Sequence, residues 1–222
     1  MSGLASTQLA RYIDHTLLKP DATAKQIEQL CVESRQHGFH SVCVNGSRVE
    51  LARHLLEESE VKVACVVGFP LGAMISDAKR FETEAAIDAG AQEIDVVINI
   101  GKLKDGDDAT VLRELRDVVE AAEEIPVKVI LETCLLTRDE IVRACHLALD
   151  SGAEFVKTST GFAQGGATID DVRLLRETVG QEFGVKASGG IRDTRMALAM
   201  IEAGATRIGT SSGVAILQGL TS

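Results

Sequence analysis

The feature that most constrains the fold is a regular alternation of short β-branched runs with longer amphipathic stretches. The predicted strands are Ile13–Leu18, Ser41–Asn45, Val61–Phe69, Glu93–Ile100, Val127–Thr133, Phe155–Thr160, Val185–Ser188 and Arg207–Ser211. The segments between them carry apolar residues at helical spacing. Eight strand–helix units of about 28 residues each predict an α/β protein with a (β/α)8 TIM barrel. The alternative is an open, doubly wound sheet.

Helix boundaries are marked by polar caps and by glycines. Three capping boxes are predicted, at Thr23 with Gln26, Ser47 with Glu50, and Thr137 with Glu140. Four glycines stand where predicted helices should end, namely Gly38, Gly90, Gly152 and Gly204. No linker or change of composition divides the chain, so a single domain over residues 1–222 is predicted.

Charge and cysteine content exclude several classes of partner. The formal net charge is −10, which makes nucleic acid and anionic membranes poor candidates. Five cysteines without a C-x-x-C pair are typical of a reducing compartment. The longest strongly apolar stretch, Val63 to Phe69, is too short to cross a bilayer, and no signal peptide is evident. We therefore expect a cytoplasmic, soluble protein.

The predicted strands each carry an aliphatic face and a polar face, because successive side chains alternate across a strand. The polar faces hold Asp14 and Thr16, Cys43 and Asn45, Glu93 and Asp95, Lys128 and Glu132, Lys157 and Ser159, and Lys186 and Ser188. We expect the aliphatic faces to pack on helices and the polar faces to line the barrel lumen. Concentrated buried charge indicates chemistry. Alternatively, a strand shifted by one residue would place its charges outside.

Two lysines are the strongest candidates for covalent chemistry. Lys157 and Lys186 lie on neighbouring predicted strands, which are about 4.8 Å apart in a sheet. A second ammonium and partial desolvation both disfavour protonation, so one amine can become a nucleophile near neutral pH. Such an amine can form a Schiff base, whose iminium accepts electrons during cleavage of a C–C bond. Asp95 is placed to pair with the second lysine and to transfer protons.

Glycine-rich turns follow the last two predicted strands and suggest a phosphate site. Loops at these positions of a barrel bind phosphate through backbone N–H groups. The predicted phosphate contacts are Gly189, Gly190, Ile191, Arg192, Gly209, Ser211 and Ser212. No H-E-x-x-H motif or cluster of His and Cys occurs, so neither a metal nor another cofactor is expected.

Motifs along the whole chain are similar to those of one family. The matching segments are Ile13–Pro20, Ser41–Val44, Gly68–Gly72, Glu93–Asn99, Val156–Phe162 and Lys186–Arg192. The sequence resembles the deoxyribose-phosphate aldolases of the class I, Schiff-base type. These enzymes reversibly cleave 2-deoxy-D-ribose 5-phosphate to D-glyceraldehyde 3-phosphate and acetaldehyde, in deoxyribose phosphate catabolism.

The resemblance also assigns roles to residues. It implies that Lys157 forms the Schiff base, that Lys186 perturbs its protonation, and that Asp95 transfers protons. Further substrate contacts are implied at Asp14, Thr16, Cys43, Thr160 and Gly161, although Cys43 could be only a small buried thiol. A homodimer or homotetramer is expected.

The chain departs from the family at its end. Some members finish in a tail with a terminal tyrosine, whereas this chain ends Gln218-Gly219-Leu220-Thr221-Ser222 and its only tyrosine is Tyr12. That role cannot be carried over. Two other functions remain open: a phosphosugar isomerase or synthase without a covalent intermediate, and a phosphosugar-binding protein without catalysis.

Overall fold

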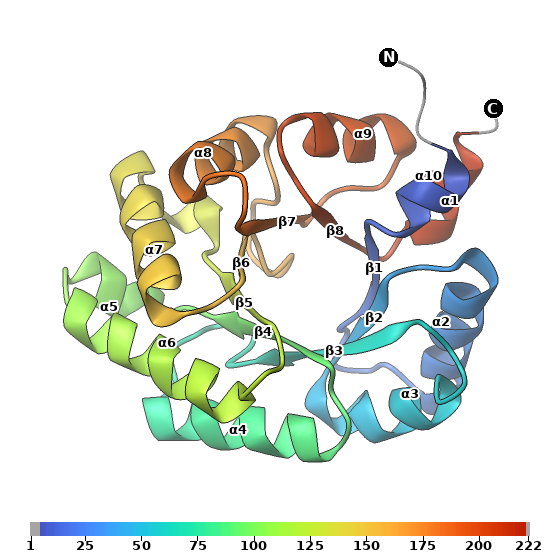
Figure 1. The fold of residues 1–222 in the computed structure, drawn as a ribbon, viewed down its shortest axis with the longest axis horizontal. Helices are drawn as coiled ribbons and strands as arrows, with labels where there is room; N and C mark the ends of the chain where they lie inside the picture. The colour runs from blue at the N-terminus through green and yellow to red at the C-terminus, as the bar shows by residue number, and fades with distance from the viewer. Residues whose placement is uncertain (1–4, 221–222) are drawn as a thin grey trace.

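Eight parallel strands form a closed barrel in the order of the sequence (Figure 1). The computed structural model describes residues 5–220. The strands are β1 Ile13–Leu17, β2 Ser41–Val44, β3 Lys62–Val67, β4 Glu93–Val97, β5 Val127–Ile130, β6 Phe155–Lys157, β7 Gly184–Ser188 and β8 Arg207–Thr210. Pairing of β1 with β8, for example Ile13 with Ile208, closes the barrel. The prediction of a (β/α)8 barrel is confirmed, and the open-sheet alternative is wrong.

A ring of helices surrounds the barrel (Figure 1). They are α1 Ser6–Ala10, α2 Ala24–His37, α3 Val49–Leu55, α4 Ser76–Asp88, α5 Ile100–Lys104, α6 Asp108–Ala122, α7 Arg138–Ser151, α8 Ile169–Val179, α9 Thr194–Glu202 and α10 Gly213–Gln218. Two 3-10 turns, η1 Gly46–Arg48 and η2 Thr133–Leu135, follow β2 and β5. None of the helices within residues 5–220 is long and apolar enough to cross a membrane.

Two of the three predicted capping boxes are present. The side chains of Thr23 and Thr137 accept hydrogen bonds from the backbone N–H groups three residues later, and the reciprocal bonds are formed. The prediction of a box at Ser47 with Glu50 is wrong. The chain first makes the turn η1 after Asn45, so α3 begins only at Val49 and has no side-chain cap.

The barrel strands separate an aliphatic layer from a charged lumen. Ile94, Val96 and Ile98 are fully buried in the main apolar core. Asp14, Asp95, Lys128 and Lys186 are fully buried as well, but they meet one another through ion pairs. The polar faces therefore line the lumen, as the alternation predicted. A small apolar cluster of Leu18, Cys43, Ala64 and Val66, with Phe69 against it, fills the remaining lumen beside β1 to β3.

Candidate active site

One carboxylate gathers three lysines inside the barrel. Asp95 Oδ2 accepts hydrogen bonds from Lys157 Nζ and from Lys186 Nζ, each at 2.8 Å. Asp95 Oδ1 accepts one from Lys128 Nζ, also at 2.8 Å. The register explains the meeting, since Lys157 pairs with Lys186 in neighbouring β6 and β7. The expected pair of Asp95 with Lys186 is present, and Lys157 and Lys128 complete the group.

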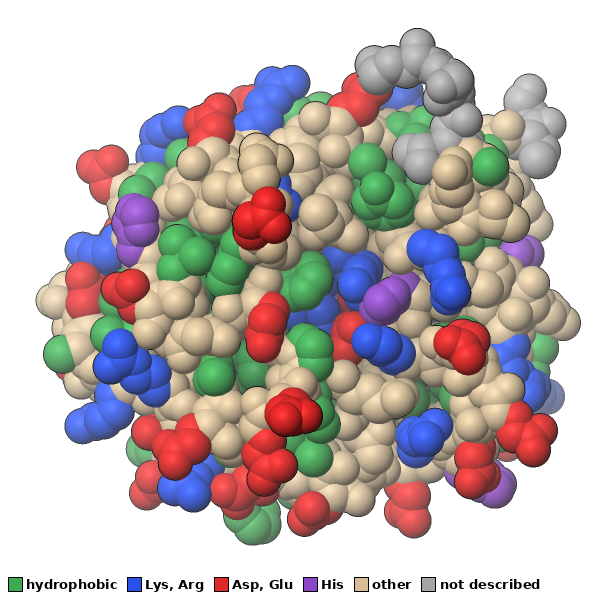
Figure 2. Space-filling view, in the orientation of Figure 1, with side chains coloured by type: hydrophobic (Ala, Val, Ile, Leu, Met, Phe, Trp, Pro, Cys, Tyr) green, Lys and Arg blue, Asp and Glu red, His purple; other side chains and the backbone are tan. Residues whose placement is uncertain are grey.

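Further ion pairs extend from this group toward the other end of the barrel. Lys186 Nζ lies 2.5 Å from Asp14 Oδ2, and Arg207 Nη1 lies 3.1 Å from Asp14 Oδ1 and 3.4 Å from Glu93 Oε2. Glu93 Oε1 lies 2.9 Å from His40 Nε2, whose side chain is 22% exposed. Figure 2 shows basic, acidic and histidine side chains gathered at the centre of the face that looks along the barrel. Charges of alternating sign thus cross the lumen.

These neighbours fix the charge state of the buried groups. Burial alone would raise the pKa of Asp95, but Lys128, Lys157 and Lys186 hold that pKa well below its ordinary value. Burial would lower the pKa of Lys186, but Asp14 and Asp95 raise it above the ordinary value. Asp95 is therefore an anion and Lys186 a cation at neutral pH. Together they place a fixed charge pair beside the Lys157 amine.

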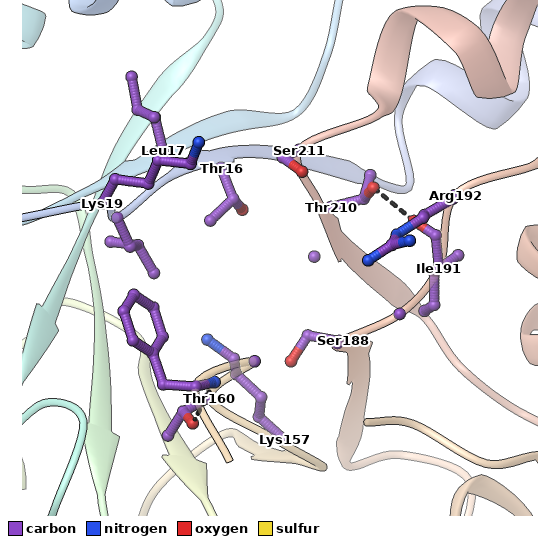
Figure 3. Close-up of a pocket in the computed structure, with 16 residues that line it drawn as sticks. Thr16, Leu17, Lys19, Lys157, Thr160, Ser188, Ile191, Arg192, Thr210 and Ser211 are labelled. Carbon is purple, nitrogen blue, oxygen red and sulfur yellow. Dashed lines mark hydrogen bonds between the residues drawn. The ribbon is translucent and has the colours of Figure 1, made fainter. Parts of the chain in front are cut away.

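A cavity of about 430 Å³ opens above this group at the carboxyl ends of the strands (Figure 3). Lys157 lies at its floor, while the turns after β7 and β8 form one side. The ionisable side chains among the described residues that line it are all basic, namely Lys19, Lys157 and Arg192. A site of this kind attracts an anion even though the whole chain is acidic.

The turns after β7 and β8 present backbone to the cavity. Gly189 and Gly190 both have left-handed φ values, of +88° and +80°, which side chains rarely adopt. A Cβ on Gly189 would also meet Gly166 Cα at 3.0 Å. On this side of the cavity, Thr210 Oγ1 donates to Ile191 O at 2.7 Å and connects the two turns (Figure 3). The glycine turns and Arg192 thus line the same cavity.

Known proteins are similar to this chain in sequence and in fold. Residues 8–219 match the family model described as DeoC/LacD family aldolase. A deoxyribose-phosphate aldolase from Alkaliphilus oremlandii (strain OhILAs) is 60% identical, over 94% of this chain and 95% of its own length. This chain belongs to the DeoC/LacD aldolase family.

More distant members of the family agree with this assignment. A deoxyribose-phosphate aldolase from Thermococcus gammatolerans is 57% identical to this aldolase, over 97% of this chain and 98% of its own. The solved structure of deoxyribose phosphate aldolase from Aeropyrum pernix superposes with a TM-score of 0.92 at 35% identity, covering 98% of this chain and 93% of its own. The aldolase described as QR15 also has a TM-score of 0.92, at 42% identity and 96% coverage of both chains.

Most of the sequence-predicted residues of the aldolase meet at the cavity. Those that line it are Thr16, Lys157, Thr160, Gly161, Gly189, Gly190, Ile191, Arg192, Gly209 and Ser211. Asp95, Lys186 and Asp14 lie buried in the lumen, linked to Lys157 through ion pairs. Cys43 is fully buried in the small apolar cluster, and Ser212 is half-buried, with its backbone N–H donating to Thr210 Oγ1 at 2.9 Å. These last two do not line the cavity of the aldolase.

The sequence did not single out several residues of the cavity wall. Lys19 lies two residues after the end of β1, and its charge near a strand end was the available signal. Phe162 is half-exposed and packs edge-on against Phe69, with ring centroids 5.1 Å apart. This aromatic contact joins loops after β6 and β3, which are distant in sequence, so no local pattern marks it. Leu17 and Leu18 add further apolar side chains to the cavity wall.

Three buried or half-buried side chains near the amino ends of the strands are of the types that bind metal ions, but they are already occupied by an arginine. Asp14, His40 and Glu93 offer ligand atoms within 4.8 Å of one another. Arg207 already bonds to both carboxylates, at 3.1 and 3.4 Å. A metal cation would have to displace this guanidinium, so we assign the group to ion pairing.

Proposed function

We propose that this aldolase reversibly cleaves 2-deoxy-D-ribose 5-phosphate to D-glyceraldehyde 3-phosphate and acetaldehyde through a Schiff base on Lys157. The observation that carries the proposal is the position of Lys157, between the buried Asp95–Lys186 pair and the cationic, glycine-lined side of the cavity. The names of the curated relatives support the substrate. Such a reaction belongs to the catabolism of deoxyribose phosphate.

The chemistry begins with the Lys157 amine. Asp95 Oδ2 lies 2.8 Å from Lys157 Nζ and is placed to accept its proton. The neutral amine adds to the C1 carbonyl of the substrate, and loss of water gives an iminium. Removal of the C3 hydroxyl proton then breaks the C2–C3 bond, and the bonding electrons move into the iminium to form an enamine. Glyceraldehyde 3-phosphate leaves, and protonation at C2 followed by hydrolysis releases acetaldehyde and the amine.

The rest of the cavity orients the substrate. The N–H groups of Gly189 and Gly190, the Arg192 guanidinium and Ser211 bind the phosphate at one end. Thr16 contacts the sugar near Lys157, while Asp14 acts from below through its ion pair with Lys186. Metal ions and other cofactors have no part in this proposal.

Borohydride trapping tests the covalent step. We expect acetaldehyde plus borohydride to leave an ethyl group on Lys157, detected by peptide mass spectrometry, and a Lys157→Met variant to show neither adduct nor turnover. Turnover without an adduct in the wild type would instead favour an isomerase or synthase that forms no covalent intermediate. Stabilisation by deoxyribose 5-phosphate without turnover would favour a phosphosugar-binding protein.

We also propose that the aldolase is a cytoplasmic homodimer or homotetramer that binds neither nucleic acid nor membranes. The Aeropyrum pernix relative is described as tetrameric, which supports self-association. Leu71, Ile75 and Phe81 are each more than 70% exposed and lie close together in sequence around the start of α4, where a second copy can cover them. Light scattering after size exclusion measures the assembly, and a monomer at micromolar concentration would contradict it.

A further inference from the structure

The chain forms a bulge at Glu132, just beyond the carboxyl end of β5. The N–H of Leu131 donates to Lys157 O and the N–H of Thr133 donates to Thr158 O, both at 2.9 Å. In a regular parallel ladder, donors two residues apart reach carbonyls two residues apart, whereas these carbonyls are adjacent. Glu132 is therefore the extra residue of the bulge, and such bulges re-aim side chains next to active sites.

Glu132 adopts a backbone conformation that is costly for its residue type. Its φ and ψ are 57° and 61°, in the left-handed region. Only one other non-glycine residue within residues 5–220, Glu123, has a positive φ. A strained residue of this kind persists only where the surrounding structure holds it, and it is found mainly at functional sites.

The buried Glu132 carboxylate holds one loop. The side chain is 2% exposed and forms no ion pair with any residue in the described part of the chain. Its oxygens accept from the N–H of Thr160 at 3.3 and 3.4 Å and from the Thr160 hydroxyl. Thr160 Oγ1 in turn accepts from the N–H of Phe162 at 3.0 Å (Figure 3). The carboxylate thus binds the segment Thr160–Phe162, which lines the cavity.

The same loop reaches the predicted phosphate turn. The N–H of Ala167 donates to Ser188 O at 3.1 Å and to Gly189 O at 3.0 Å. Gly166 lies so close to Gly189 that a Cβ on Gly166 would meet Gly189 O at 2.4 Å. The loop after β6 is therefore fixed at Glu132 on one side and packed on the Gly189 turn on the other. A displacement at Thr160 is transmitted to the place where phosphate is expected.

We propose that Glu132 is a positioning residue that sets the cavity wall between Lys157 and the phosphate turn. The Glu132 carboxylate acts by accepting hydrogen bonds from the N–H and the hydroxyl group of Thr160. The bulge after β5 orients the Glu132 side chain toward Thr160. This inference rests on the proposed function for the nature of the substrate. It assigns Glu132 no proton transfer, so an uncharged acceptor of the same length should serve equally well.

Two substitutions separate this role from a merely structural one. Glu132→Gln keeps the length and the acceptor oxygen, so we expect kcat/KM for deoxyribose 5-phosphate within about threefold of wild type, since the loop stays held. Glu132→Asn tolerates the left-handed backbone but is one methylene too short to reach Thr160. We expect its kcat/KM to fall about 10- to 100-fold, mainly through KM, with the thermal midpoint preserved. Acetaldehyde, which carries no phosphate, should still be trapped on Lys157 in both variants.

Hydrogen exchange gives a readout that does not depend on catalysis. The N–H groups of Thr160 and Phe162 should lose protection in Glu132→Asn and keep it in Glu132→Gln. Wild-type KM and protection in the Asn variant, or equal damage in both variants, would overturn the inference. Absence of turnover in the wild type would overturn the proposed function alone. Should the Asn variant fail to fold, Glu132→Asp, which keeps the charge but is equally short, should raise KM in the same way, and a wild-type KM in that variant would refute the role of Glu132.

Discussion

Asp95 is the residue at the centre of the buried ion pairs in the barrel. A single buried carboxylate contacts three ammonium groups, each at 2.8 Å. Isolated, such a charge would be costly to bury, and so would each lysine. In the barrel, the carboxylate and the three ammonium groups compensate one another's charge through hydrogen bonds. The amine of Lys157 still faces the cavity. The cations that lower the pKa of Asp95 keep its carboxyl group in the anionic form.

Substituting a single lysine, Lys186→Met, should change the pH dependence of the reaction. Lys186 is one of the cations that hold the pKa of Asp95 well below its ordinary value. Its loss should raise the pKa of Asp95, because one of the three cations that lower this pKa is removed. The acid limb of kcat/KM should then move to higher pH, in addition to a large loss of rate. Lys104→Met removes an exposed lysine and should leave the profile unchanged. An unmoved acid limb in Lys186→Met would refute the electrostatic role.

The elements differ in how much of them the sequence predicts. Parity alone placed Asp95, Lys157 and Lys186 in the lumen, because the strands of a closed barrel have a fixed inner face. The positions of the glycine-rich turns were predictable because they directly follow β7 and β8, and their binding of phosphate stays a prediction. The β5 bulge at Glu132 was not, since it depends on which carbonyls of β6 its N–H groups reach. The predicted capping box at Ser47 was wrong for a similar reason. A 3-10 turn is inserted before α3, and the residue types there do not indicate it.

Two glycines of the β7 turn should respond differently to a methyl group. Gly189→Ala and Gly190→Ala impose the same left-handed strain, but only the first brings a Cβ within 3.0 Å of another backbone atom. We expect Gly189→Ala to raise KM for deoxyribose 5-phosphate at least about tenfold, because the turn must move. Gly190→Ala is the matched control and should raise it less. Steady-state kinetics with phosphorylated and unphosphorylated deoxyribose measure this, and equal effects would argue against close packing as the cause.

At the scale of the whole molecule, ion pairs replace part of the aliphatic filling that barrel interiors ordinarily have. The alternating charges run from Lys157 at the cavity to His40 near the opposite end. Breaking such a buried network by removing one partner costs about 3–5 kcal/mol. The stability of the aldolase therefore depends on the same charges as its proposed chemistry.

The buried charges should confine the stable pH range from both sides. The pKa values of Asp95 and Glu93 are lower in the folded protein than in the unfolded chain. These two groups therefore stabilise the fold fully above the ordinary carboxyl pKa. That contribution is lost as the pH falls through their folded-state pKa values. The pKa values of Lys128 and Lys186 are higher in the folded protein than in the unfolded chain. These two groups therefore stabilise the fold fully below the ordinary lysine pKa. That contribution is lost as the pH rises through their folded-state pKa values. We expect the free energy of unfolding in urea to be highest between about pH 5 and 10. A steady rise from pH 8 to pH 11 would contradict this.

The closure of the barrel has a consequence for the order in which the protein assembles. Arg207 in β8 bonds to Asp14 in β1, 193 residues earlier in the chain. While the chain is being synthesised, Asp14 leaves the ribosome long before its guanidinium partner exists. A nascent barrel that lacks β8 would have to bury two carboxylates, Asp14 and Glu93, without that partner. Closure is thus penalised until the last strand arrives, which discourages compaction around an incomplete catalytic centre.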